Sequence, residues 1–378
     1  MSQATKKLQK LKDNIFRPRK KIEQHIAVFG ESGSGKTTLL NTFYGWHKEP
    51  AFKQNVGYSL LAEDANQGLR LSNGYLKMKE SLLPETTRYQ YHSFKFTITV
   101  KDLERPAGSI VWHDYPGEWW TENKKEVEAR RKLEAFRSLL ESDIAFFLCD
   151  GQSLKNEGGK YIRRLFGSFR DELERQKNAV LSDQKKLTTF PRIWVICLSK
   201  SDLFPDKDVY WFKDEVHRAA ADEIIELKSV LGEILNGDQY QSIGEDFLLL
   251  SSAKFNPETG KIVDLKQNIG IDLIPPISII LPIKRALLWA RVGEQGNAGI
   301  YKILEIFRNL TTNWMKYLPL VGNVFMLLDD TAKSATDKLK DIKISARKKG
   351  DSASAVVAAF AGKLRTDDTQ KIYFSDKQ

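Results

Sequence analysis

The segment from Gly30 to Thr37, GESGSGKT, matches the pattern G-x-x-x-x-G-K-[ST] and constrains the fold more than any other part of the chain. An apolar strand at residues 25–30 leads into it, and a helix is expected over residues 36–44. In that strand–loop–helix context the pattern binds nucleotide phosphates, because glycines turn main-chain N–H groups inward and the helix start adds its positive dipole end. We therefore expect a nucleoside triphosphate here, bound by Gly30, Ser32, Gly33, Ser34, Gly35, Lys36, Thr37 and Thr38. Lys36 is expected to reach the β- and γ-phosphates, and the Thr37 hydroxyl to bind Mg²⁺.

Further apolar segments follow the loop, at residues 109–112, 143–149, 192–198 and 247–250. Strands without polar alternation are buried on both faces, as in a parallel sheet, and helical stretches lie between them. Residues 94–100 instead alternate apolar and polar side chains, which predicts an antiparallel strand near a sheet edge. The pattern predicts an α/β fold, with a mostly parallel sheet, helices on both faces, a helical insertion and a helical C-terminal region.

Four parts are expected along the chain. Residues 1–24 form a basic arm, and residues 25–275 form a nucleotide-binding domain with an inserted helical segment at about 152–187. Residues 276–349 are expected to be helical, and residues 350–378 to be a weakly ordered tail with a short helix. Six glycines and prolines between residues 45 and 86 predict irregular structure there.

The composition is that of a globular protein, with 41% hydrophobic and 29% charged residues over 378 positions. Both cysteines, Cys149 and Cys197, lie in predicted core strands, where we interpret them as small apolar fillers in a reducing compartment. No secretory leader and no spanning helix is predicted, so we expect a cytoplasmic protein.

Three later motifs each follow a predicted strand, where parallel strands bring their carboxyl ends together. Asp114-Tyr-Pro-Gly117 has the form D-x-x-G, in which the aspartate can hold Mg²⁺ through water and the glycine N–H can meet the γ-phosphate. The other two are Ser199-Lys-Ser-Asp202 and Ser251-Ser-Ala-Lys254.

These two motifs favour guanine as the base. The Asp202 carboxylate can accept hydrogen bonds from guanine N1–H and the 2-amino group, whereas adenine would leave it unpaired. The N–H of Ala253 can bind the guanine oxygen. The residues expected around the base are Lys200, Asp202, Ser252, Ala253 and Lys254.

Together, the loop and the three motifs resemble the GTPase superfamily of Ras-like and translation-factor-like proteins. The chain is similar to bacterial GTPase-type proteins with a diverged base motif, some of which belong to defence or multi-component gene systems. The resemblance covers about residues 22–275 and implies a Mg²⁺-dependent GTP hydrolase that switches between two states. Two features depart from it. Ser199 replaces the usual asparagine, and Lys36 and Asp114 lie 114 − 36 = 78 residues apart, so the segment before the first switch is enlarged.

The resemblance also implies a switch threonine, for which Thr86 and Thr87 are candidates and Thr87 is favoured, so the expected metal ligands are Thr37, Thr87 and Asp114. Arg88 is either an internal arginine finger or a solvated surface residue. Glu118 either orients the attacking water or lies on a loop surface, and a carboxylate near the γ-phosphate implies slow intrinsic hydrolysis with help from a partner.

The formal net charge is +10, with much of the excess at the two ends. Adjacent tryptophans, Trp119 and Trp120, are either buried or a nucleotide-dependent contact surface. The expected partners are a guanine nucleotide and a protein. An anionic membrane surface could bind the basic ends and the apolar residues 314–328, and nucleic acid is not indicated. Two other functions stay open: an ATP-dependent NTPase or phosphotransferase, and a scaffold stabilised by its nucleotide.

Overall fold

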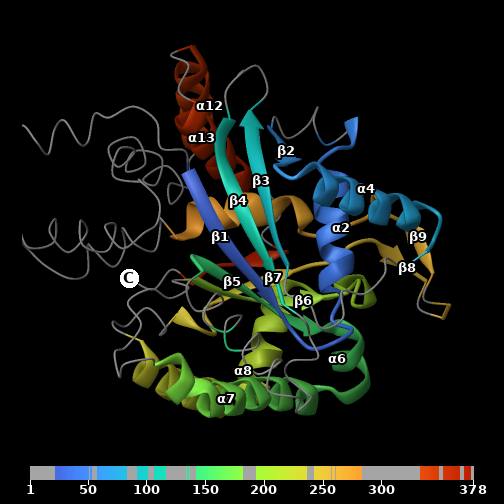
Figure 1. Ribbon diagram of the computed structural model, residues 1–378, viewed down its shortest axis with the longest axis vertical. Helices are drawn as coiled ribbons and strands as arrows, with labels where there is room; N and C mark the ends of the chain where they lie inside the picture. The colour runs from blue at the N-terminus through green and yellow to red at the C-terminus, as the bar shows by residue number, and fades with distance from the viewer. Residues whose placement is uncertain are drawn as a thin grey trace, which may run out of the picture.

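A computed structural model describes residues 22–50, 52, 58–82, 92–100, 106–115, 133, 136, 142–181, 193–235, 242–256, 258–259, 261–282, 333–348, 352–366 and 370–375. Within these ranges one sheet of eight strands has the order β10-β7-β6-β5-β1-β4-β3-β2 (Figure 1). Its strands are β1 (Ile22–Phe29), β2 (Tyr58–Ala62), β3 (His92–Val100), β4 (Pro106–Asp114), β5 (Ile144–Asp150), β6 (Ile193–Ser199), β7 (Asp246–Leu249) and β10 (Ile372–Tyr373). A separate hairpin pairs β8 (Lys254–Phe255) with β9 (Ile262–Asp264).

The sheet confirms the predicted strand directions. Strands β4, β1, β5, β6 and β7 are parallel to one another, and β5 and β6 are buried at every position. The alternating segment forms β3, which is antiparallel to β4 and one strand away from the edge. The short strands β2 and β10 close the two edges in antiparallel pairing.

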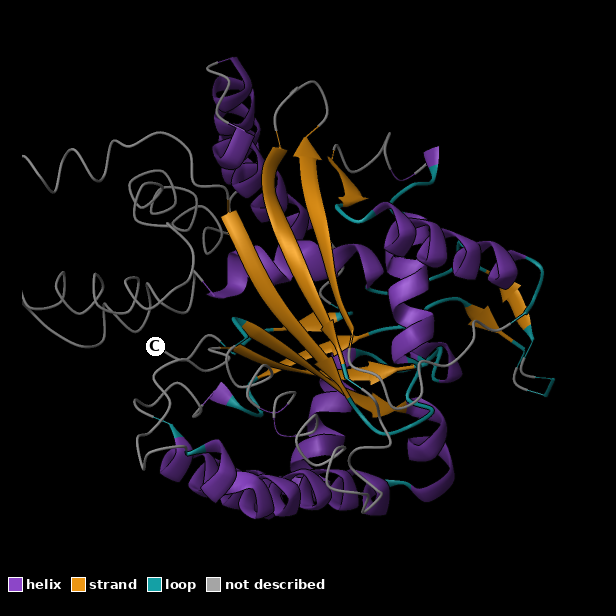
Figure 2. Ribbon diagram, in the orientation of Figure 1, coloured by secondary structure: helices purple, strands orange, loops and turns teal. Residues whose placement is uncertain are grey.

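Helices cover both faces of the sheet, as predicted (Figure 2). Ile26 and Val28 of β1 face a core shared with α2 (Lys36–Trp46), the helical residues 274–282 and α13 (Ser352–Thr366). The intervening Ala27 and Phe29 face the other core, against α7 (Gly159–Val180) and α8 (Val209–Ile234). Alternate side chains of the phosphate-loop strand are thus buried on opposite faces, so the start of the loop is held by packing from both sides.

The helical segment expected at about 152–187 is described as α6 (Gly151–Glu157) and α7. Together these helices connect β5 to β6, two neighbouring parallel strands. The segment is therefore the crossover that a parallel pair requires.

The prediction of irregular structure over residues 45–86 was wrong, because β2 and α4 (Ala65–Lys79) lie there. Two of the presumed breakers instead allow α4 to lie against α2. A Cβ added to Gly74 would lie 2.0 Å from Asn41 Oδ1, and one added to Gly45 would lie 2.0 Å from Tyr75 Cγ. These glycines serve close helix packing, a use that sequence alone does not separate from a turn.

The short helix predicted after residue 350 is present as α13, and it is longer than predicted. There α13 is buried through apolar residues such as Val357 and Phe360, and α12 (Lys333–Lys348) packs along it. Beyond α13, β10 pairs with β7. Within the described ranges, no helix is long and apolar enough to cross a membrane.

Candidate nucleotide site

The predicted site residues that the structure describes lie at the carboxyl ends of neighbouring parallel strands, which end on the same side of the sheet. The phosphate loop follows β1, Asp114 is the last residue of β4, and Asp150 is the last residue of β5. The motifs ending at Asp202 and Lys254 follow β6 and β7. Segments that are far apart in the sequence thus form one candidate site.

The phosphate loop has the backbone that its glycines permit. Gly33 and Gly35 have φ of 80° and 89°, in the left-handed region that favours glycine. A Cβ added to either would have no atom within 4 Å, so the space beside both residues is open for a ligand. Gly35 is the N-cap of α2, and the first N–H groups of a helix have no partner within that helix. This arrangement fits a phosphate group.

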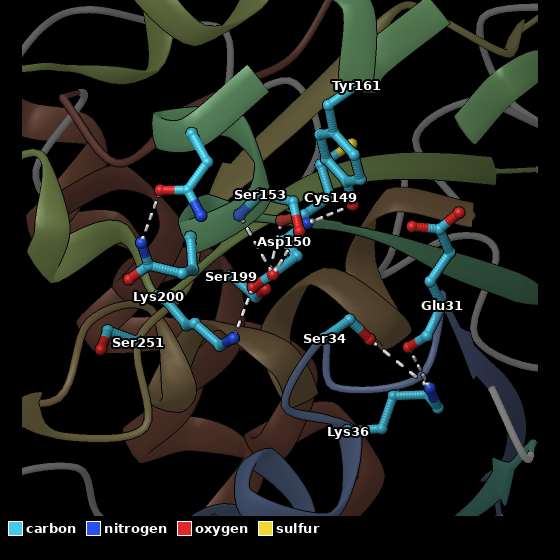
Figure 3. Close-up of polar contacts among 12 residues, drawn as sticks. Glu31, Ser34, Lys36, Cys149, Asp150, Ser153, Tyr161, Ser199, Lys200 and Ser251 are labelled. Atoms are coloured by element: carbon cyan, nitrogen blue, oxygen red, sulfur yellow. Dashed lines mark hydrogen bonds and ion pairs between the residues drawn. The ribbon is translucent and has the colours of Figure 1, made fainter. Parts of the chain in front are cut away.

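The Lys36 side chain lies inside the loop and is only 8% exposed. Its Nζ donates to the carbonyl oxygens of Gly30 at 2.8 Å and Glu31 at 2.9 Å, and lies 3.4 Å from Ser34 Oγ (Figure 3). Since a Lys ammonium has three donor hydrogens, the loop itself fixes this cation beside the open space.

Thr37 and Asp114 offer oxygen ligands on either side of the loop. Thr37 is the second residue of α2, while Asp114 pairs in register with Val28 of β1 and is 2% exposed. A hydroxyl and a carboxylate are oxygen donors that suit Mg²⁺, so the donor set fits the predicted metal.

The Asp202 carboxylate is fixed by two partners from the neighbouring loop. Ser251 Oγ donates to Oδ1 at 2.6 Å, and the Phe255 N–H donates to Oδ2 at 3.1 Å. Ser251 Oγ also lies 2.7 Å from the Ala253 carbonyl oxygen. Because each carboxylate oxygen has more than one lone pair, Asp202 can still accept hydrogen bonds from a base.

Lys200 is oriented by Asp150. Its backbone has a φ of 53°, unusual for a non-glycine residue, and its Nζ lies 2.7 Å from Asp150 Oδ1 (Figure 3). The other oxygen of Asp150 caps α6, accepting from Ser153 N at 3.2 Å and Ser153 Oγ at 2.8 Å. Ser199, which stands where an asparagine is usual, donates from Oγ to the Cys149 carbonyl oxygen at 3.1 Å. The serine therefore still links the ends of β5 and β6.

The third motif contributes in unequal ways. Ala253 is fully buried and packs with Tyr75 and Met78 of α4, whereas Lys254 is exposed and Ser252 half-buried.

The two cysteines are buried, and burial raises the pKa of both thiols, which keeps them protonated.

Sequence reasoning missed Asp150, Ser251 and Phe255. Asp114 was predicted from its D-x-x-G pattern after a strand. Asp150 also follows an apolar strand, but it has no such pattern, and only its position after the strand could have pointed to it. Ser251 stands first in a Ser-Ser pair, and only the fold shows that it is the one that contacts Asp202.

Several predicted residues lie outside the described ranges. They are Thr86, Thr87, Arg88, Gly117, Glu118, Trp119 and Trp120, together with the basic arm before residue 22 and the apolar residues 314–328.

Comparison with solved structures finds distant likenesses. The signal recognition particle receptor SRb-GTP/SRX complex from Chaetomium thermophilum is 16% identical with a TM-score of 0.32, over 63% of this chain and 93% of that one. Elongation factor SelB from Methanococcus maripaludis is 13% identical with a TM-score of 0.28, over 70% of this chain and 35% of that one. Era from Aquifex aeolicus is 18% identical with a TM-score of 0.26, over 73% and 69% of the two chains.

Comparison with curated proteins finds no match. The profile of a protein family, in contrast, matches residues 24–232, from β1 to near the end of α8, and so includes the phosphate loop, Asp114 and Asp202. That range is more than half of the chain, which therefore belongs to the Double-GTPase 2 family, within the P-loop GTPases.

Proposed function

We propose that this protein is a Mg²⁺-dependent switch that binds GTP, hydrolyses it slowly and engages a protein partner in the GTP state. The observation that supports this best is that two charged side chains are already oriented by their neighbours at the carboxyl ends of the parallel strands. The Lys36 ammonium is held inside an open glycine loop, and the Asp202 carboxylate is oriented by Ser251 and Phe255.

On the phosphate side, Lys36 exchanges its carbonyl partners for phosphate oxygens, and the N–H groups at the start of α2 add further donors. Thr37 and Asp114 would hold Mg²⁺, with Thr87 as a third ligand. An ion held there would neutralise charge on the β- and γ-phosphates.

On the base side, Asp202 accepts from guanine N1–H and the 2-amino group, while Lys200 stays beside the base through Asp150. The Ala253 N–H donates to the guanine oxygen. Adenine offers no matching donor pair, so it leaves the carboxylate without compensation.

For hydrolysis, we propose that Glu118 orients the attacking water, Gly117 contacts the γ-phosphate and Arg88 stabilises charge in the transition state. A glutamate brings negative charge toward an anionic phosphate, so the unassisted reaction is slow. Thr87 closes over the ion only when a γ-phosphate is present, which makes the partner surface depend on the nucleotide.

A competition assay tests the proposal. The full chain is incubated with a fluorescent GDP derivative and Mg²⁺, and GTP or ATP is added as competitor, with Lys36→Ala as the variant that lacks the ammonium. We expect GTP to compete far better than ATP, and Lys36→Ala to lose binding. Equal competition by the two nucleotides would favour the ATP-dependent alternative. Tight binding without turnover of GTP, alone or with cell extract, would favour the scaffold.

A further inference from the structure

The second residue of the phosphate loop, Glu31, places a carboxylate where a triphosphate is expected. Its carbonyl oxygen accepts from Lys36 Nζ at 2.9 Å, so the Glu31 side chain starts from a residue whose backbone contacts the ammonium that would bind phosphate. The side chain is only 13% exposed, and burial raises the pKa of this carboxyl group. A negative charge at this position repels a phosphate unless something compensates it.

The compensating charge comes from α7. Arg164 Nη1 donates to Glu31 Oε1 at 3.0 Å, while Nη2 donates to both oxygens of Glu157 at 3.1 and 3.2 Å. The guanidinium also lies over the Tyr161 ring, 5.4 Å from its centroid. Tyr161 in turn accepts from the Asp150 N–H at 2.7 Å. Arg164 is thus fixed by several contacts, and it draws the Glu31 carboxylate toward α7.

We propose that Arg164 is a positioning residue for triphosphate binding: it pairs with Glu31 and holds that carboxylate away from the γ-phosphate. The inference rests on the proposed function, since it concerns the phosphate side of the same site. A triphosphate carries more negative charge than a diphosphate, so loss of Arg164 weakens triphosphate binding more than diphosphate binding. Replacing Glu31 by glutamine then removes the need for Arg164.

The test compares four proteins: wild type, Arg164→Gln, Glu31→Gln and the double variant. Dissociation constants with Mg²⁺ are measured for GDP, a non-hydrolysable GTP analogue, inorganic pyrophosphate and inorganic triphosphate. We expect Arg164→Gln to weaken binding of both triphosphates about tenfold and of the diphosphates less than about threefold. In the double variant, triphosphate binding should return to within about twofold of wild type.

The matched control is Arg163→Gln. Arg163 is the neighbouring residue on α7, but its Nε lies 3.3 Å from Glu223 of α8, so it takes no part in the loop. We expect this variant to leave the ratio of triphosphate to diphosphate affinity unchanged. Thermal unfolding of every variant shows whether it is folded.

Two results would overturn the inference: an equal loss of triphosphate and diphosphate binding in Arg164→Gln, or no recovery in the double variant. Failure of the proposed function is seen separately. If wild type binds triphosphates without preferring guanine, the proposed base recognition fails and the inorganic ligands still decide the role of Arg164. If wild type binds no phosphate ligand, both are wrong.

Discussion

Replacing Asp202 by asparagine tests base recognition at a single atom. The structure indicates that the variant side chain keeps its orientation. Its amide oxygen can still accept from the Phe255 N–H, which now lies 3.1 Å from Oδ2. Its amide nitrogen can donate to Ser251 Oγ, which in turn donates to the Ala253 carbonyl oxygen, 2.7 Å away. The neighbouring loop should therefore hold its shape.

The substitution is expected to weaken binding of the guanine base. Asp202 offers guanine two acceptors, and asparagine offers one acceptor and one donor. One charge-assisted hydrogen bond, worth about 1.5–3 kcal/mol, is lost, and a donor then faces the 2-amino donor of guanine, which leaves a polar group unsatisfied at about 1 kcal/mol or more. The sum of about 2.5–4 kcal/mol corresponds to a dissociation constant for GTP that is raised about 70- to 900-fold.

Xanthine has an oxygen where guanine has the 2-amino group, and this oxygen can accept from the new amide. We therefore expect Asp202→Asn to bind xanthosine triphosphate better than GTP, in the same competition assay with fluorescent GDP or its xanthosine counterpart. Asp206→Asn, an exposed position four residues further on, is the control for general loss of charge. Binding of GTP by Asp202→Asn within about threefold of wild type would refute the reasoning.

Four further predictions concern stability. Gly74→Ala should destabilise the fold by about 1–3 kcal/mol in urea unfolding, because the new Cβ would lie 2.0 Å from Asn41 Oδ1. In contrast, Gly167→Ala on α7, where nothing lies within 4 Å, should stabilise it by about 1 kcal/mol. Burial lowers the pKa of His113 to about 3, so unfolding takes up a proton between that value and the ordinary 6.5. Stability therefore falls as the pH drops, and His113→Gln should reduce the loss between pH 7 and pH 5 by about 2 kcal/mol. Gln24 is fully buried, and within the described ranges its amide atoms have no hydrogen-bond partner. Gln24→Met should raise the free energy of unfolding by about 1–2 kcal/mol, and an unchanged or lower value would contradict this.

Much of the sheet could be predicted from the sequence because its physics is local. A run such as Ile193–Ser199, buried at every position, is typical of a strand covered on both sides. The loop motif and the residues that follow such strands then lie near one another, because parallel strands end on the same side of the sheet. This is why Lys36, Asp114 and Asp202 could be predicted as site residues without a structure.

The remaining features depend on contacts between distant segments. Gly74 reads as a helix breaker until Asn41 is seen against it, and Ser251 reads as one serine of a pair until Asp202 is seen to accept its hydrogen bond. Likewise α13 was predicted as a short helix, but only the fold shows that the sheet offers the apolar face against which it is buried. Single-residue patterns do not contain this information.

The pairing of β10 with β7 has a consequence for how this polypeptide is made. The Leu249 N–H donates to the Lys371 carbonyl oxygen at 2.9 Å, and the Val209 N–H to that of Gln370 at 2.8 Å. One border of the nucleotide domain, the edge of the sheet at β7, is thus paired with residues that are synthesised more than a hundred positions after β7. During synthesis that border, and the apolar surface under α13, stay uncovered for many seconds. A truncation before residue 352 would leave the same surfaces bare permanently, so it should yield aggregation-prone material rather than a smaller working enzyme.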